Sequence, residues 1–83
     1  MYELRLTTHA ENDLRTLDAK FRFAVIAAMR AHLTHEPAKT SKSRIKRMRE
    51  LKLPQYRLRV DGIRIYYDIG EGYVMIHGIV PKD

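Results

Sequence analysis

The first 37 residues of the chain carry apolar residues in two different periods. Tyr2, Leu4 and Leu6 alternate with charged residues, which predicts a short, half-buried strand over residues 2–6. Further on, apolar residues recur at helical intervals and would form one stripe along a helix surface. These residues are Leu14, Leu17, Phe21, Val25, Ala28, Met29 and Leu33. We expect Met29 and both phenylalanines, Phe21 and Phe23, to pack in the core.

Polar residues and a proline mark the expected ends of this helical segment. Thr8 followed by Glu11 matches a capping box, in which side-chain oxygens accept hydrogen bonds from the free backbone N–H groups of the first turn. Asp18 can cap a second helix after a break near Leu17, which favours two helices packed as a hairpin. Pro37 ends the helical run.

The C-terminal half changes to the two-residue period of strands. Residues 56–60 and 63–69 alternate apolar and polar side chains on either side of Asp61-Gly62, a dipeptide typical of tight hairpin turns. Gly70-Glu71-Gly72 predicts a second turn, and residues 73–80 predict one more strand. The sequence therefore predicts a three-stranded antiparallel meander after the helices.

Between the helices and the meander, residues 38–54 show no clear period. We expect a surface connection there, with one turn of helix or a short strand. Together the elements predict an α+β fold in the order β-α-α-β-β-β, with two N-terminal helices packed on an antiparallel sheet. At 83 residues the chain is expected to form a single domain, residues 1–83, with one modest core.

Composition narrows the class of protein. The chain has no cysteine, which excludes disulfide frameworks, thiolate zinc sites and thiol nucleophiles. Its apolar runs are far shorter than the about 20 residues that a membrane helix needs, and its N-terminus lacks the layout of a signal peptide. We therefore expect a cytoplasmic protein with no membrane partner.

Positive charge is concentrated in one part of the sequence. The formal net charge is +6, and residues 39–52 alone carry that excess, with seven basic residues and one acid. Extending the segment to Arg64 raises its charge to +8 and leaves the remainder at −2. Such polarity favours a polyanionic partner, although a solvated basic surface has the same composition.

Strand alternation brings further basic groups to the sheet face that the helices leave open. The side chains expected there are Arg57, Arg59, Arg64 and Tyr66. Like charges side by side destabilise a sheet, so this cluster points to a ligand unless acids such as Asp61 and Asp68 neutralise it. Guanidinium groups match phosphate oxygens and a tyrosine ring stacks on a base, which favours single-stranded RNA over duplex DNA.

The same residues resemble a known family. Residues 45–49 (Ile-Lys-Arg-Met-Arg), residues 55–69 and residues 74–82 resemble the RelE/ParE toxin superfamily of bacterial toxin–antitoxin systems. The superfamily signature is a Tyr-Arg-Leu-Arg-Val strand, a short turn, an Arg-Val-Ile-Tyr strand and a closing hydrophobic strand that ends in a basic residue. The resemblance implies a RelE/ParE-like fold and the toxin of a type II module, of the plasmid stabilisation type, held by a RelB-, Phd- or YefM-like antitoxin.

The resemblance also implies an activity. RelE-like members enter the ribosomal A site and cut mRNA with basic side chains of the concave sheet face, which inhibits translation without a metal or cofactor. Arg57 and Arg59 match the paired basic positions of the first meander strand, Arg64 matches the arginine after the turn, and Lys82 matches the basic position after the last strand. The alternatives are a ParE-like poison of DNA gyrase and a non-cleaving relative that binds RNA or the ribosome.

Two departures from the family pattern bear on catalysis. Cleaving members carry a tyrosine a few residues beyond the last basic position, where this sequence has only Asp83. The two strand positions are arginines where strong ribonucleases often have lysine, and arginine, with a pKa above roughly 12, is a poor general base. Weaker cleavage is therefore expected than in the strongest ribonucleases of the family.

Proton transfer and RNA binding need further residues. His77 on the last strand is a candidate for acid–base work unless it packs or only faces water, and Tyr66 is a candidate proton donor, whereas Tyr67 is expected in the core. The remaining histidines, His9, His32 and His35, lack the spacing of metal ligands. The expected RNA-binding residues are Lys42, Arg44, Lys46, Arg47, Arg49 and Tyr66.

Overall fold

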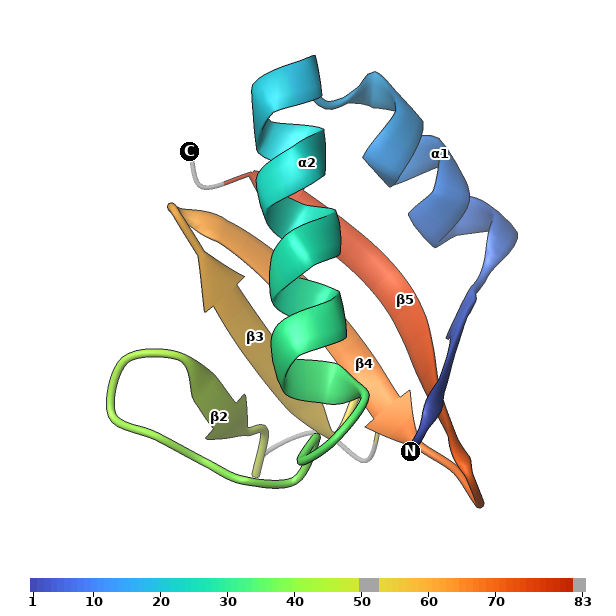
Figure 1. The fold of residues 1–83 in the computed structure, drawn as a ribbon, viewed down its shortest axis with the longest axis vertical. Coiled ribbons are helices and arrows are strands. Elements are labelled where there is room, and N and C mark those ends of the chain that lie inside the picture. Colours follow the sequence, from blue (N-terminus) through green and yellow to red (C-terminus); the bar gives the residue numbers. More distant parts are fainter. Residues whose placement is uncertain (50–52, 82–83) are drawn as a thin grey trace.

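The computed structural model describes residues 1–49 and 53–81 (Figure 1). Its elements are β1 (Glu3–Leu6), α1 (Thr8–Thr16), α2 (Ala19–Ala28), a short π-helical segment η1 (Met29–Leu33), β2 (Ile45–Arg47), β3 (Tyr56–Val60), β4 (Ile63–Ile69) and β5 (Tyr73–Pro81). The strands form one sheet in the order β1-β5-β4-β3-β2, and both helices lie over the same face of it. The α+β class and the hairpin of two helices are confirmed. No helix in the described ranges is long and apolar enough to cross a membrane.

The sheet differs from the expected antiparallel one in two respects. β1 runs parallel to β5, with Glu3 opposite Tyr73 and Leu6 opposite Ile76, so the sheet is mixed. β2 adds a fifth strand that pairs antiparallel with β3. Side-chain alternation identifies a strand and its buried face, but it contains no information about the neighbour or its direction. At three residues, β2 is also too short to show a period.

The first helix begins one residue earlier than the capping-box pattern predicts. Thr7 is the N-cap, and its hydroxyl accepts a hydrogen bond from the Ala10 N–H at 3.1 Å. The backbone N–H of Thr7 also donates to the Ile76 carbonyl of β5 at 3.0 Å. Because this sheet contact fixes the end of β1, it selects Thr7 over Thr8 as the cap.

The helical stripe supplies the side of the core that faces the sheet. Leu17, Val25, Met29 and Leu33 are buried against the sheet, and the other stripe residues pack partly buried beside them. The prediction is wrong for Phe23, whose side chain is 71% exposed. Phe21 and Phe23 lie two positions apart, about 200° around a helix, so only one of them can face the core.

The meander forms as predicted. Asp61 and Gly62 form the two-residue turn between β3 and β4, with φ angles of 46° and 81°. Positive φ at both positions matches the twist of the flanking strands, and aspartate followed by glycine accepts that conformation. The turn sets the register that pairs Arg59 with Arg64, on which the site depends.

Candidate nucleic-acid interface

The register of the sheet brings the predicted basic residues together on the face opposite the helices. Arg59 lies directly across from Arg64, and Arg57 lies across from Tyr66. Lys46 of β2 pairs with Arg57 from the other side. Neighbouring strands lie about 4.8 Å apart, so these side chains form two adjacent rows across β2, β3 and β4. We call this surface, residues Lys46, Arg57, Arg59, Arg64 and Tyr66, the basic face.

Within the described residues, 1–49 and 53–81, no acid forms an ion pair with the arginines of the basic face, Arg57, Arg59 and Arg64. The Nε atoms of Arg57 and Arg64 are buried and have no hydrogen-bond partner there. A buried donor without an acceptor is costly, so an anion that brought oxygen acceptors to these two guanidinium groups would be favoured.

Basic residues of the segment around β2 extend this face beyond the strand. A hollow of about 650 Å³ is lined by Thr40, Ser41 and residues 45–49, which include Lys46, Arg47 and Arg49. The guanidinium of Arg47 lies over the Tyr56 ring, 5.0 Å from its centre. The structure therefore brings these three predicted RNA-binding residues together at the β2 edge.

The remaining predicted site residues are placed differently. Arg44 lines a separate hollow of about 300 Å³ that it shares with His32 and Arg59, at the border between the helices and β3. Lys42 is exposed in the loop before β2. Lys82 lies outside the described residues.

His77 is presented to the open side of the sheet by a β-bulge. Tyr66 pairs with Gly78 and Tyr67 pairs with Ile76, so His77 is an extra residue in β5. Both Ile76 and Ile79 point into the core despite their spacing of three residues, which a regular strand would not allow. The His77 Nε2 atom lies 2.5 Å from the Asp68 carboxylate oxygen Oδ2.

Sequence reasoning assigned no functional role to Asp68. It lies on the same side of β4 as Arg64 and Tyr66, at positions i, i+2 and i+4, and this spacing was the available signal. Its other oxygen, Oδ1, accepts the backbone N–H of Gln55 at 2.6 Å. The bulge that brings His77 beside it breaks the two-residue period, so that pairing depends on the three-dimensional structure.

The two neighbouring tyrosines have different environments. Tyr67 is fully buried, stacks on Tyr56 with ring centres 5.5 Å apart, and donates its hydroxyl to the Pro37 carbonyl at 2.6 Å. Burial, with a smaller effect of Tyr56, raises the pKa of Tyr67 well above its usual value. Tyr67 is therefore a core residue, whereas Tyr66 remains on the basic face, partly exposed.

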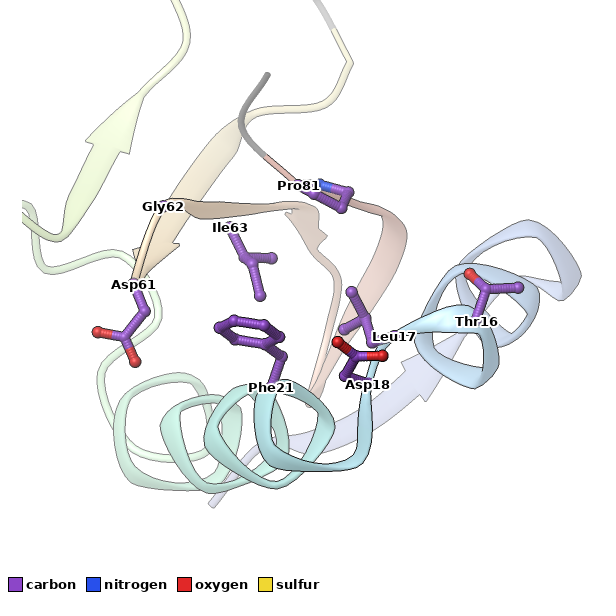
Figure 2. A pocket seen from close by; sticks show the side chains of 8 residues that line it. All are labelled: Thr16, Leu17, Asp18, Phe21, Asp61, Gly62, Ile63 and Pro81. Carbon is purple, nitrogen blue, oxygen red and sulfur yellow. The ribbon is translucent and has the colours of Figure 1, made fainter.

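Another cavity in the molecule is lined mainly by apolar residues and two carboxylates. It measures about 430 Å³ and lies between the α1–α2 turn and the β3–β4 turn (Figure 2). The Phe21 ring points toward Ile63 inside it, and the carboxylates of Asp18 and Asp61 lie on either side. None of the described residues that line it is basic. The described residues also contain no group of three histidine or acidic side chains that could hold a metal ion.

Comparisons with known proteins agree with this architecture. Neither a protein-family model nor a curated protein matches the chain. Among solved structures, it is similar to the RelBE2 toxin–antitoxin complex from Mycobacterium tuberculosis, with 25% identity and a TM-score of 0.83 over 98% of both chains.

Two further structures share the fold at lower identity. The archaeal RelE–RelB complex from Pyrococcus horikoshii OT3 has a TM-score of 0.77 at 18% identity over 98% of this chain and 94% of that chain. The intact RelBE toxin–antitoxin complex of E. coli has a TM-score of 0.66 at 13% identity over 100% and 99% of the two chains. Over almost its whole length, this chain therefore has the fold of the RelE toxins in these complexes.

Proposed function

We propose that this chain is the toxin of a type II toxin–antitoxin module and that it cuts mRNA on the ribosome, which inhibits translation. The observation that carries the proposal is the basic face, in which Arg57 and Arg64 each have a buried, unpartnered Nε on the open side of a RelE-like sheet. An mRNA phosphate supplies the acceptors that these donors lack. The chain would act as one domain in the cytoplasm, where its substrate is.

The reaction is attack of a ribose 2′-hydroxyl on the adjacent phosphodiester. A 2′-oxygen–phosphorus bond forms, the bond to the 5′-oxygen breaks, and the products are a 2′,3′-cyclic phosphate and a 5′-hydroxyl. Negative charge develops on the phosphorane oxygens, and Arg57, Arg59 and Arg64 are placed on one surface to stabilise it. One well-placed donor in such a site contributes about 3 kcal/mol. Lys82 is assigned the same role on the resemblance alone.

A proton acceptor for the 2′-hydroxyl must come from another side chain, because the arginines stay protonated. His77 is the candidate on this side of the sheet, and its side chain is 38% exposed. Tyr66 lies between Arg57 and Gly78 in the pairing register and can donate a proton to the leaving 5′-oxygen. The mechanism needs no metal ion or cofactor.

An antitoxin would silence this site by covering it. The similar structures from M. tuberculosis, P. horikoshii and E. coli are toxin–antitoxin or RelE–RelB complexes. An acidic or amphipathic segment suits this chain, because it can neutralise the basic face and lie against the sheet or the helices. The proposed partners are therefore a RelB-like antitoxin, the ribosome and mRNA.

Expression in bacteria with mapping of mRNA ends tests this function. Wild-type chain should arrest growth and produce cuts within translated codons, and Arg64→Ala should cut about 100-fold more slowly because one phosphate donor is lost. Arg30→Ala, at an exposed position on η1, is the matched control and should behave like wild type. Growth arrest with DNA breaks and intact mRNA would instead indicate a gyrase poison, and arrest without either lesion a non-cleaving binder.

A further inference from the structure

His77 and Asp68 are in contact, with the imidazole exposed and the carboxylate placed to hold it. We infer that His77 accepts the 2′-hydroxyl proton through its Nδ1 atom, and that Asp68 is the positioning residue that fixes the imidazole in the required tautomer. The inference rests on the proposed ribonuclease function and names the atoms that move the proton within it. It adds Asp68, which the family resemblance does not assign.

The hydrogen bonds of Asp68 determine which nitrogen carries the proton. Its Oδ1 accepts the Gln55 N–H and its Oδ2 faces Nε2 of His77 at 2.5 Å, so the carboxylate acts as an acceptor on both sides. An ionised carboxylate has no proton to donate, which places the hydrogen of a neutral imidazole on Nε2. The Nδ1 lone pair is then available, and Nδ1 has no partner within residues 1–49 and 53–81.

The position of Asp68 is itself fixed by the backbone of two strands. The Gln55 N–H donates to Asp68, and the Gln55 side-chain oxygen accepts the Ile69 N–H at 3.0 Å, so the two residues bridge the start of β3 and the end of β4. The Asp68 side chain is only 14% exposed, compared with 38% for His77. The carboxylate is therefore held while the imidazole remains accessible.

The bulge that carries His77 is held from its other side by α1. The Thr7 hydroxyl donates to the His77 carbonyl at 3.3 Å, and the Asp13 carboxylate accepts the Ile79 N–H at 3.0 Å. Helix α1 and its N-cap residue therefore hold the bulge through two hydrogen bonds, in the conformation that turns His77 toward Asp68. Positioning of this kind is what acid–base catalysis requires of a side chain.

The pair lies close enough to the basic face to act on one phosphodiester. Gly78, the residue after His77, pairs with Tyr66, and Tyr66 pairs with Arg57 in the next strand. Arg64 pairs with Val80, so it is a diagonal neighbour of Gly78, and such neighbours lie about 7–8 Å apart.

Every proton in the reaction is accounted for without another reactant. Nδ1 takes the proton of the 2′-hydroxyl as the 2′-oxygen bonds to phosphorus, and the leaving 5′-oxygen takes a proton from Tyr66 or water. The imidazolium then returns its proton to that donor, which restores the starting state. Nothing is oxidised or reduced, and RNA is the sole substrate.

Single-turnover cleavage of mRNA on programmed ribosomes tests the inference. His77→Gln can keep a hydrogen bond to Asp68 but has no group that accepts a proton, so we expect cleavage at saturating toxin to slow at least about 100-fold. Half-saturation should stay unchanged, because the basic face is intact. Asp68→Asn keeps the bond to Gln55 but presents an N–H₂ donor to Nε2, which moves the imidazole hydrogen to Nδ1 and should slow cleavage similarly.

Controls separate catalysis from structure. His35→Gln alters an exposed histidine that makes no hydrogen bond to the bulge, and this matched variant should cleave like wild type. The double variant of His77 and Asp68 should be no slower than His77→Gln alone, because the two residues act as one unit. Thermal unfolding of each variant establishes that the fold is retained.

The failures of the two proposals are distinguishable. Wild-type protein that leaves ribosome-bound mRNA intact would contradict the ribonuclease function and the dyad together. Wild-type cleavage with His77→Gln at nearly the same rate would overturn the dyad alone. Multiplicative effects in the double variant would overturn the positioning role of Asp68 while leaving the ribonuclease function standing.

Discussion

The two faces of the sheet differ in composition, because one is covered by the helices and apolar and the other is open and carries arginines. On β4, Ile63, Ile65 and Tyr67 are at most 4% exposed and point to the helices, and the described residues include no buried charged side chain. The intervening residues of β4 point to the opposite face. There Arg64 lies across from Arg59 of β3, and neither arginine forms an ion pair with an acid in the described ranges. Adjacent positions in the sequence therefore serve stability on one face and, in our proposal, RNA chemistry on the other.

The largest expected effect comes from the covered face. Ile65 is fully buried in the core, and Ile65→Ala should lower the free energy of unfolding by about 2–5 kcal/mol through lost burial and a residual cavity. The adjacent Arg64→Ala should change it by less than about 0.5 kcal/mol. Urea unfolding of the two variants measures both values. Similar losses for the two would contradict the division between the faces.

A single hydrogen bond within the covered face gives the next effect. Tyr67→Phe keeps the stacked ring but removes the hydroxyl that donates to the Pro37 carbonyl, leaving that acceptor unpaired. The expected loss of stability is about 1–2 kcal/mol. Tyr56→Phe is the matched control on the partner ring and should cost less than about 0.5 kcal/mol in the same urea experiment. Equal costs would show that the Pro37 bond contributes nothing.

On the basic face, by contrast, a substitution is expected to raise the free energy of unfolding. Arg59→Glu replaces a like-charge pair opposite Arg64 with an opposite-charge pair, so stability should rise by about 0.5 kcal/mol while cleavage falls. Arg59→Gln, which removes the charge without reversing it, should give a smaller gain. The urea midpoint and the ribosome assay measure the two effects. A loss of stability in Arg59→Glu would mean that the arginines support each other in the folded state.

Side-chain alternation was enough to predict which residues of β3 and β4 lie on each face. The period of two assigned Ile65 and Tyr67 to the core and Arg57 and Arg64 to the open side, and Asp61-Gly62 predicted the turn between the strands. These features depend on local backbone geometry, which neighbouring residues determine.

Features that depend on distant contacts were not predictable in the same way. The parallel pairing of β1 and the choice of Thr7 as helix cap both follow from contacts with β5, about 70 positions away in the chain. The bulge at His77 also depends on which strand lies beside β5, so the contact with Asp68 appears only in the folded chain. The candidate site was thus predictable as a charged surface but not as a pair of interacting groups.

The smallest predicted effect tests the border between the two faces. His32 of η1 shares a hollow with Arg44 and Arg59, and burial followed by the charge of Arg44 lowers the pKa of His32 in the folded protein. The unfolded chain binds that proton more readily, so the contribution of His32 to stability is present above its usual value, about 6.5, and is lost as pH falls below it. The charged and titratable groups lining the hollows around His32 are His35, Glu36, Lys39, Arg44, Arg59 and Asp61.

Unfolding measured from about pH 8 to about pH 5 gives the readout, since the usual histidine value lies inside that range. His32→Gln should lose part of the fall in stability on acidification, because its side chain does not titrate. Arg44→Gln should reduce the fall without abolishing it, since burial is the larger cause of the lowered pKa. An unchanged pH dependence in both variants would mean that neither burial nor the charge of Arg44 lowers the pKa of His32 in the folded protein.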